Sequence, residues 1–244
     1  MHPFVGLPLA GVPSHDRQVY MAGYVDPNDE MVQAFSKLGT TPVSDALDRL
    51  GLGGQVYGVK PVDRDFQLCG RAFTVRNEPM TAGHKGESVG DYIDEVPEGG
   101  VVVIDNAARL DATVWGDILT IMADRNKLGG TVINGVCRDS QRALVLNYPI
   151  FSRGTYMRTG KDRVRADAYN EPVSLGEVRV LPGDLILGDG DGIVVIAKEH
   201  EEAVLKAAQE IDVAEERIRE EIAKGGRLDA AREKFKYHQL QSRQ

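Results

Sequence analysis

The sequence predicts an α/β fold in which helices pack around a mixed β-sheet, and three observations support this class. Residues 101–104 form a continuous apolar run, which is typical of a strand buried on both faces. From residue 101 to residue 152, apolar runs alternate with segments of helical periodicity, and this order implies parallel strands with right-handed crossovers. Residues 173–196 instead show short strands interrupted by Gly and Pro, as in hairpins. The combination favours an α/β sandwich over a plain Rossmann unit.

Composition and charge exclude several classes of protein. The chain has 244 residues, of which 42% are hydrophobic and 27% charged, and is long enough to bury a core. Its formal net charge of −8 argues against a nucleic-acid partner, since phosphate binding needs clustered Lys and Arg. No apolar run approaches the roughly 20 residues that span a membrane. Cys69 and Cys137 lie in apolar surroundings, which suits buried thiols and a cytoplasmic location.

The N-terminal part predicts an arm followed by two helices and two strands. Residues 1–25 are rich in Gly, Pro and His, and we expect an extended arm. Residues 26–38 predict a helix capped by Asp26, and residues 42–50 predict a second helix capped by the threonines before it. Strands are expected at residues 59–61 and 68–75.

The central segment predicts the alternating part of the fold. The buried strand at 101–104 leads into a loop over residues 106–115 and then a helix over residues 117–126. In this helix Ile118, Ile121 and Met122 share a face that we expect to point inward. The elements that follow are a strand at 131–133, the start of a helix at 143–147 and a strand at 150–152.

The C-terminal part predicts one long helix over residues 199–224, ended by a pair of glycines. Its apolar stripe consists of Val204, Ala207, Ala208, Ile211, Ile218 and Ile222. The chain then divides into an arm (1–25), an α/β core domain (26–198) and a C-terminal helix and tail (199–244), which we expect to pack on a neighbouring subunit.

Most catalytic motifs are absent from the sequence, which has no nucleophile elbow, P-loop, His-Glu-x-x-His or Cys-x-x-Cys. The segment Gly188-Asp-Gly-Asp-Gly192 lacks the ligands of an EF-hand and precedes an apolar strand, so it predicts a tight turn between strands. The five histidines are scattered and none has a zinc-ligand spacing. Any bound metal would be a hard ion held by carboxylate and water, which points to Mg²⁺ or Mn²⁺.

The candidate site lies in two turns that follow neighbouring buried strands. Gly116 and Asp117 begin the helix after the first strand, where the free N–H groups of Asp117 and Ile118 could receive a substrate carboxylate. The second strand leads to Arg138 and Asp139, a cation beside an anion. Taken alone this pair could be a surface Arg and a helix cap, but two ligand-friendly turns at the carboxyl ends of adjacent strands favour a binding site.

Several motifs together resemble the RraA-like family, which includes class II pyruvate aldolases acting on 4-hydroxy-4-methyl-2-oxoglutarate and 4-carboxy-4-hydroxy-2-oxoadipate. The most specific is the Gly116-Asp117 pair, followed after twenty residues by Arg138-Asp139. The others are Thr41-Pro-Val-Ser-Asp-Ala-Leu-Asp48, Gly70-Arg-Ala-Phe-Thr-Val75, Gly100-Val-Val-Val-Ile-Asp105, Tyr148-Pro-Ile-Phe-Ser-Arg-Gly154, Val180-Leu-Pro-Gly-Asp184 and Asp189-Gly-Asp-Gly-Ile-Val-Val-Ile196. The resemblance spans about residues 40–224 and implies an αββα sandwich resembling a phosphohistidine-domain barrel.

The resemblance also implies roles for these residues. Asp139 would be the one direct protein ligand of the metal, and Arg138 would bind the 2-oxo acid and stabilise its enolate. Asp117 would order metal-bound water, and the backbone near Gly116 and Ile118 would hold the substrate carboxylate. Family members form trimers or hexamers in which a glutamate from a neighbour's C-terminal helix completes the site. Glu216, Glu220 and Glu221 are the candidates for it, among which Glu220 is our choice.

The function implied is a carbon–carbon lyase that cleaves a 4-hydroxy-2-oxo acid to pyruvate and a second 2-oxo acid, with oxaloacetate decarboxylation as a related activity. The alternative is a non-catalytic regulator of the RraA type that binds a protein partner, and the retained Asp117 favours the enzyme. A methyltransferase lacks support, because no glycine-rich strand–loop–helix with a following acidic residue is present. Two features depart from the aldolase pattern: residues 106–115 contain no glycine, and Arg142 stands where an acidic residue is common.

Overall fold

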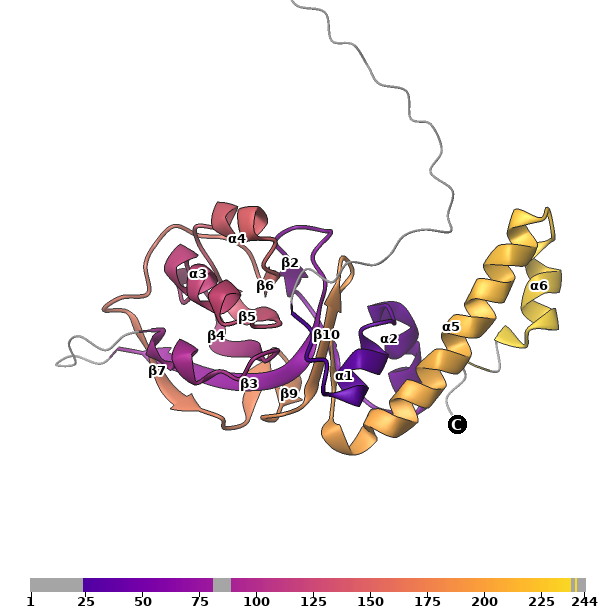
Figure 1. The fold of residues 1–244 in the computed structure, drawn as a ribbon, viewed down its shortest axis with the longest axis horizontal. Coiled ribbons are helices and arrows are strands. Elements are labelled where there is room, and N and C mark those ends of the chain that lie inside the picture. The colour runs from indigo at the N-terminus through magenta and orange to yellow at the C-terminus, as the bar shows by residue number, and fades with distance from the viewer. Residues whose placement is uncertain (1–23, 81–88, 238–239, 241–244) are drawn as a thin grey trace, which may run out of the picture.

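The computed structural model describes residues 24–80, 89–237 and 240, and its centre is a large mixed sheet flanked by helices (Figure 1). The long helix α5 (Glu201–Ala223) runs away from the sheet, and α6 (Leu228–Lys234) folds back beside its far end. The helices α3 (Asp117–Arg125) and α4 (Gln141–Leu146) lie at the other end of the molecule. The arm predicted for residues 1–25 lies outside the described residues, except for residues 24 and 25.

The sheet has nine strands, in the order β1-β11-β10-β3-β4-β5-β6-β2, with β7 paired to β3. These strands are β1 (Gln55–Val56), β2 (Lys60–Pro61), β3 (Leu68–Pro79), β4 (Val101–Thr113), β5 (Gly130–Val136), β6 (Ile150–Ser152), β7 (Val164–Tyr169), β10 (Leu185–Asp189) and β11 (Gly192–Ile196). The run β3-β4-β5-β6 is parallel and the other pairings are antiparallel. A separate hairpin joins β8 (Val173–Leu175) to β9 (Val178–Val180). The predicted parallel strands and hairpins are confirmed.

Two hydrophobic clusters hold the helices to the sheet. The larger cluster is built on β4, β5 and β6, whose buried runs pack under α3, α4 and the 3₁₀ helix η1 (Asp91–Glu95). The second cluster joins β10 and β11 to α1 (Glu30–Phe35), α2 (Thr40–Arg49) and the first half of α5. Because this half of α5 is buried within its own chain, the C-terminal helix is part of the core, and packing of its far end on a neighbour stays a prediction.

The helices α1 and α2 begin at different caps from those predicted. Asp29, not Asp26, caps α1, because its carboxylate accepts the N–H of Val32 at 3.0 Å. The threonines do not cap α2. The carboxylate of Asp189 does so from a distant turn, accepting the N–H of Thr40 at 2.8 Å and its hydroxyl at 2.7 Å. That turn is the predicted glycine-rich connection between two strands, which is confirmed.

The predicted inward face of α3 is wrong at Ile118 and Ile121, whereas Met122 packs against the core as predicted. Ile118 and Ile121 are 75% and 43% exposed, whereas Thr120 and Ala123 are buried. Four apolar residues between 118 and 122 leave two possible faces, and periodicity alone did not distinguish them. The indole N–H of Trp115 donates to the hydroxyl of Thr120 at 3.0 Å, and this bond keeps Thr120 inside.

The segment predicted as a loop over residues 106–115 belongs mostly to β4. After Asp105 the pairing with β5 continues with two register shifts, at Arg109 and at Thr113. Ala107 and Ala108 accommodate the irregularity with positive φ values of 52° and 54°. The irregular strand therefore remains attached to the sheet up to the turn that begins α3.

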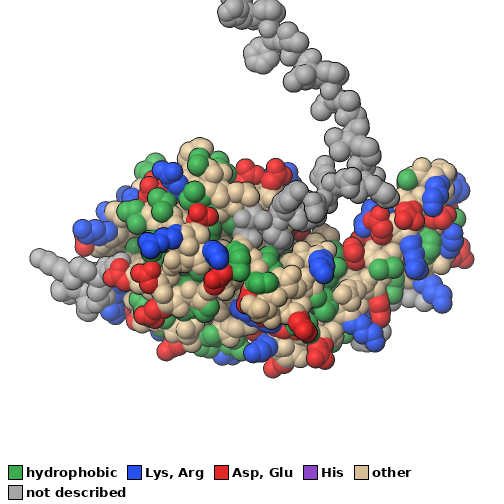
Figure 2. Space-filling model, viewed as in Figure 1, with side chains coloured by type: hydrophobic (Ala, Val, Ile, Leu, Met, Phe, Trp, Pro, Cys, Tyr) green, Lys and Arg blue, Asp and Glu red, His purple; other side chains and the backbone are tan. Residues whose placement is uncertain are grey.

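The remaining sequence predictions concern the cysteines, a membrane span, the surface charge and the fold class. Cys69 and Cys137 are buried free thiols, as predicted. In the described ranges, no helix is long and apolar enough to cross a bilayer. The face shown in Figure 2 carries interspersed acidic and basic side chains, and the absence of a nucleic-acid partner stays a prediction. The mixed α/β class is confirmed, and a sandwich or phosphohistidine-domain-like barrel stays a prediction.

Candidate functional site

The turns that follow β4 and β5 lie against one another. The N–H of Arg138 donates to the carbonyl of Trp115 at 2.9 Å, which joins the two turns directly. A Cβ atom added to Gly116 would lie 3.0 Å from Oδ2 of Asp139 and 3.4 Å from Nε of Arg138. The structure thus brings together Gly116, Arg138 and Asp139, and a side chain at position 116 would crowd the pair.

The N-terminus of α3 presents unfilled backbone donors. Gly116 is the N-cap residue and supplies no side-chain cap, so the N–H groups of Asp117 and Ile118 have no partner within the helix. Thr120 donates both its N–H and its hydroxyl to the Gly116 carbonyl, at 3.1 and 3.0 Å. These two bonds hold the first turn in place. Its free N–H groups and the positive end of the helix dipole favour an anion there.

A buried aromatic pair supports this turn from below. Trp115 is 2% exposed, and its indole stacks nearly parallel on the ring of Tyr148 with centroids 6.3 Å apart. The hydroxyl of Tyr148 lies 2.8 Å from that of Thr131, a buried residue of β5. These contacts fix the backbone of residue 116 relative to the sheet.

Arg138 and Asp139 form a half-exposed ion pair. The Nε of Arg138 lies 3.3 Å from Oδ2 of Asp139, with side-chain exposures of 40% and 45%. Asp139 has a φ of 53°, in the left-handed region that non-glycine residues adopt at a cost of about 1 kcal/mol. Its carbonyl accepts the N–H of Arg142 at 3.1 Å. Such strain in a ligand-accessible carboxylate is common at functional sites.

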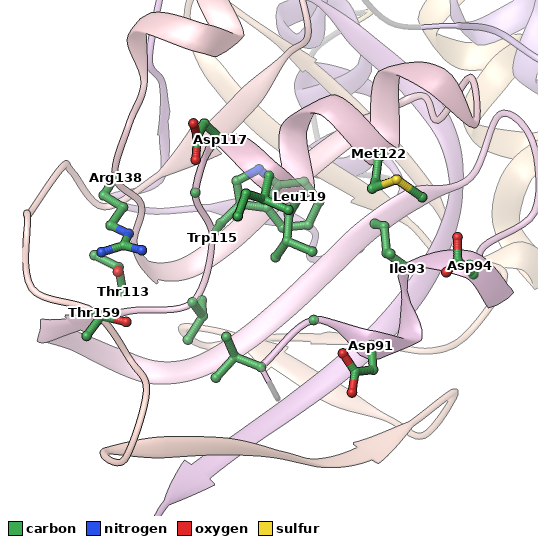
Figure 3. Close-up of a pocket in the computed structure, with 15 residues that line it drawn as sticks. Asp91, Ile93, Asp94, Thr113, Trp115, Asp117, Leu119, Met122, Arg138 and Thr159 are labelled. Atoms are coloured by element: carbon green, nitrogen blue, oxygen red, sulfur yellow. The ribbon is translucent and has the colours of Figure 1, made fainter. Parts of the chain in front are cut away.

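These elements border a pocket of about 510 Å³ (Figure 3). Arg138 and Asp117 lie on one side of it, and residues of η1 lie on the other. The lining residues are Val89, Gly90, Asp91, Ile93, Asp94, Thr113, Val114, Trp115, Gly116, Asp117, Ile118, Leu119, Met122, Arg138 and Thr159. Asp139 stands beside the pocket, next to Gly116 and Arg138.

Sequence reasoning missed the wall that η1 contributes. Asp91 and Asp94 are exposed on η1, while the two residues between them, Tyr92 and Ile93, are buried. A single 3₁₀ turn is too short to show hydrophobic periodicity, so its position gave no signal. Gly90-Asp91 repeats the Gly-Asp of the start of α3, but the same dipeptide also occurs at residues 183, 188 and 190, so it does not single out this turn.

The predicted glutamates of α5 lie far from this pocket in their own chain. Glu216, Glu220 and Glu221 are near the end of α5 that runs away from the sheet, opposite to α3 (Figure 1). They form ion pairs there with Arg219 at 2.9 Å, Lys224 at 3.9 Å and Lys234 at 3.0 Å, respectively. A role for any of them in catalysis requires a neighbouring subunit and stays a prediction.

The donor set around Asp139 fits a hard, hydrated ion. Within the described ranges, no group of three His, Cys, Asp or Glu residues could cage a metal. Asp139 offers one half-exposed carboxylate at the pocket, and a single carboxylate with water ligands is a typical site for Mg²⁺. Zinc, which needs three or four protein ligands, does not fit this set.

Known proteins with similar sequence or structure agree on one family. Residues 40–195 match the family model RraA-like, described as Aldolase/RraA. The "Putative 4-hydroxy-4-methyl-2-oxoglutarate aldolase" of Halalkalibacterium halodurans is 37% identical over 180 residues, which cover 74% of this chain and 82% of that protein. Protein DlpA of Legionella pneumophila is 37% identical over 215 residues, 88% of this chain, and the chain spans only 35% of its length.

A solved structure agrees with these sequence relatives. An uncharacterized protein from Pseudomonas syringae superposes with a TM-score of 0.77 at 38% identity, covering 83% of this chain and 96% of that one. The matched region contains the turns after β4 and β5, with the Gly116-Asp117 and Arg138-Asp139 pairs. On these grounds the chain belongs to the RraA-like, or Aldolase/RraA, family.

Proposed function

We propose that this protein is a divalent-metal-dependent carbon–carbon lyase, a class II pyruvate aldolase. It cleaves a 4-hydroxy-2-oxo acid to pyruvate and a second 2-oxo acid, and decarboxylates oxaloacetate through the same enolate. The observation that carries the proposal is the contact between the two turns, which puts Arg138 and Asp139 against the open N-terminus of α3. A guanidinium, a carboxylate and free backbone amides in one place suit a 2-oxo acid.

The chain's own groups divide the work on the substrate. The free N–H groups of Asp117 and Ile118 bind the substrate carboxylate, helped by the positive end of the α3 dipole. The guanidinium of Arg138 faces the 2-oxo oxygen and stabilises the negative charge that grows there as the C3–C4 bond breaks. Asp117 orients the water that accepts the proton of the 4-hydroxyl.

Asp139 would hold the divalent ion, Mg²⁺ or Mn²⁺, together with water and the substrate. When bound, such an ion supplies Lewis-acid polarisation of the 2-oxo group. The pair with Arg138 at 3.3 Å keeps the Asp139 carboxylate oriented toward the turn at Gly116. Arg138 therefore has two tasks, orientation of Asp139 and stabilisation of the enolate.

The complete site is formed between subunits of a homotrimer or homohexamer. The half-exposed Arg138 and Asp139 leave the pocket open on one side. The far end of α5, which carries Glu216, Glu220 and Glu221, projects from its own sheet, and we expect it to reach a neighbouring pocket (Figure 1). A glutamate there, for which Glu220 is our choice, would serve in proton transfer at the 4-hydroxyl.

The second candidate function is that of an RraA-type regulator which binds a protein partner without chemistry. The observation that favours it is the apolar exposure of α3 and α4, where Ile118 is 75% and Val145 67% exposed. Exposed apolar residues of this kind suit a protein interface. The family model that matches this chain is described by both names, Aldolase and RraA.

A substrate screen separates the two functions. Purified protein is incubated with 4-hydroxy-2-oxo acids and with oxaloacetate, with Mg²⁺ or Mn²⁺ and then with EDTA, and pyruvate is measured by a coupled assay. We expect metal-dependent pyruvate formation that EDTA abolishes and that Arg138→Ala lowers by at least about a hundredfold. Asp124→Asn, on the outer side of α3, is the control and keeps wild-type rates. If no substrate yields pyruvate with either metal, the lyase proposal fails and the regulator is favoured.

A further inference from the structure

We propose that Thr159 is a substrate-binding residue of this pocket, whose hydroxyl donates a hydrogen bond to a carboxylate at the distal end of the substrate. The inference rests on the proposed function and deepens it by naming a residue that selects a substrate with two carboxylates. Thr159 belongs to the rim segment, residues 154–161, and lines the pocket on the side of Arg138 (Figure 3). Three features support this role: the attachment of the rim segment, the orientation of the hydroxyl and the local charge.

The rim segment is attached to both strands that carry the site. The N–H of Tyr156 donates to the carbonyl of Cys137, the residue that follows β5, at 2.9 Å. Thr113, at the end of β4, donates its N–H and its hydroxyl to the carbonyl of Arg158, at 3.1 and 3.0 Å. Residue 159 therefore has a fixed position relative to the two turns that form the site.

The hydroxyl of Thr159 is oriented by its own turn. Its Oγ1 accepts the N–H of Lys161 at 3.2 Å, and the guanidinium of Arg163 donates to the carbonyls of Thr159 and Lys161, both at 3.3 Å. A hydroxyl has one donor proton and two lone pairs, so the bond from Lys161 leaves the proton available. Because Thr159 lines the pocket, that proton can be donated to a ligand there.

Thr159 lies where the distal end of a bound substrate would be. In Figure 3, Asp117, Arg138, Thr113 and Thr159 follow one another along one side of the pocket. A substrate with its C1 carboxylate at the start of α3 and its 2-oxo group at Arg138 extends C4 and C5 toward Thr159. The hydroxyl therefore meets a carboxylate at C5, away from the reacting carbonyl.

The charge around Thr159 favours an anion. Residues 153–165 contain five basic side chains and one acidic side chain, in a chain whose net charge is −8. Arg158 and Lys161 are exposed on either side of Thr159. The guanidinium carbon of Arg158 lies 6.0 Å from the centroid of the Tyr156 ring, a cation–π contact that holds the charge at the rim segment. This local positive potential attracts a substrate with two negative charges.

The opposite wall directs the distal carboxylate to the same side. Asp91 and Asp94 line the pocket across from Arg138 (Figure 3). Their negative charges repel a substrate carboxylate, so its favoured position is the wall that carries Thr159. The two walls together select a substrate whose second carboxylate lies at Thr159.

The test compares binding of 2-oxoglutarate and 2-oxopentanoate. Their distal ends are a carboxylate and a methyl group, respectively, and neither acid has the 4-hydroxyl that cleavage requires. Dissociation constants are measured by calorimetry with Mn²⁺ present, for wild type, Thr159→Val, Thr159→Ser and Thr155→Val. Valine keeps the shape of threonine without its hydroxyl, and serine keeps the hydroxyl. The exposed Thr155 is the matched control in the same segment.

The loss should be confined to the acid with two carboxylates. We expect Thr159→Val to weaken 2-oxoglutarate binding about tenfold, because a hydrogen bond to a charged group is worth about that factor. Binding of 2-oxopentanoate should change by less than about twofold. Thr159→Ser and Thr155→Val should bind both acids as wild type does. The exchange of pyruvate methyl protons in D₂O with Mg²⁺ involves no distal group and should keep its wild-type rate in all three variants.

The outcomes separate the inference from the proposed function. If wild type exchanges pyruvate protons but does not bind 2-oxoglutarate, or if Thr159→Val binds this acid as tightly as wild type, the inference is overturned and the proposed function stands. An equal loss for both acids, or slower pyruvate exchange in Thr159→Val, would show that the hydroxyl only supports the structure of the site, which also overturns the inference. If wild type neither binds 2-oxoglutarate nor exchanges pyruvate protons with Mn²⁺ or Mg²⁺, the proposed function fails and the inference fails with it.

Discussion

The backbone N–H of Arg138 donates a 2.9 Å hydrogen bond to the carbonyl of Trp115 and so joins the turns that follow two adjacent parallel strands. The bond requires both turns to leave the sheet at the same edge, as parallel pairing of β4 and β5 dictates. It also sets the spacing between Gly116 and the Arg138–Asp139 pair. The site is therefore a consequence of sheet topology, and it can be tested by changes on either turn.

Gly116→Ala should lower activity while leaving the fold intact. The new methyl would lie 3.0 Å from Oδ2 of Asp139 and 3.4 Å from Nε of Arg138, so both side chains would have to move. We expect a loss of at least about tenfold in kcat/KM, because small displacements of catalytic groups are costly. Gly53→Ala is the matched control, since no atom lies within 4 Å of its added Cβ. If Gly116→Ala and wild type are equally active, the close approach of residue 116 to Asp139 and Arg138 has no catalytic role.

Asp189→Ala should destabilise the protein without impairing its chemistry. The carboxylate caps α2 through the N–H and hydroxyl of Thr40, at 2.8 and 2.7 Å, and also accepts the N–H of Asp191 at 2.9 Å. Loss of such a cap costs about 1 to 2 kcal/mol in the free energy of unfolding, measurable by urea denaturation. Asp191→Ala, in the same turn, should change the free energy of unfolding by less than about 0.5 kcal/mol. If the two variants are equally stable, Asp189 is not the cap of α2.

Stability should decrease in acid partly through Asp29. Hydrogen bonding to the Arg71 side chain lowers the pKa of the Asp29 carboxyl below its usual value. A lowered pKa gives a stabilising contribution that is present above the unfolded pKa of about 4 and is lost as pH falls through the folded value. Wild type should therefore lose stability more steeply below about pH 4 than Asp29→Asn. Parallel curves of unfolding free energy against pH would rule out this contribution.

Ala107→Gly and Ala108→Gly should stabilise the irregular part of β4. These alanines have φ values of 52° and 54°, a conformation that costs an L-residue about 1 kcal/mol and glycine nothing. After the entropic cost of glycine in the unfolded chain, a net gain of up to about 0.5 kcal/mol is expected for each. Thermal unfolding measures this change in stability. Ala203→Gly in α5 is the control and should lose about 1 kcal/mol of unfolding free energy. A loss at either β4 position would contradict the left-handed conformation.

Much of the fold could be predicted because its strands differ in pattern. The continuous apolar run at 101–104 and the Gly-punctuated hairpins at 173–196 have distinct signatures, and both are confirmed. The cap of α2 could not be predicted, since it comes from a residue far along the chain. The inward face of α3 could not be predicted because a side-chain hydrogen bond selects it, and hydrophobic periodicity does not register such a bond. Asp189 reaches α2 across 149 positions, and Trp115 selects Thr120 as the buried residue of α3.

The sequence predicted one side of the pocket, the two turns after β4 and β5, and missed the opposite wall. Gly116, Asp117, Arg138 and Asp139 could be found because a fixed spacing after buried strands identifies them, and the structure places the two turns in contact. The opposite wall, with Asp91 and Asp94, comes from one 3₁₀ turn whose position depends on tertiary packing alone. This wall of the pocket was therefore found only from the structure.

The most direct test of the central claim measures enolate formation from pyruvate itself. In D₂O with Mg²⁺, the exchange of the pyruvate methyl protons for deuterium is followed by ¹H NMR, which requires no knowledge of the natural substrate. Wild type and the control Asp124→Asn should exchange these protons well above the uncatalysed rate. EDTA, Arg138→Ala and Asp139→Asn should abolish the exchange, and asparagine is chosen because it tolerates the left-handed backbone at position 139. Exchange that persists undiminished in Asp139→Asn would contradict a metal and enolate site at Arg138 and Asp139.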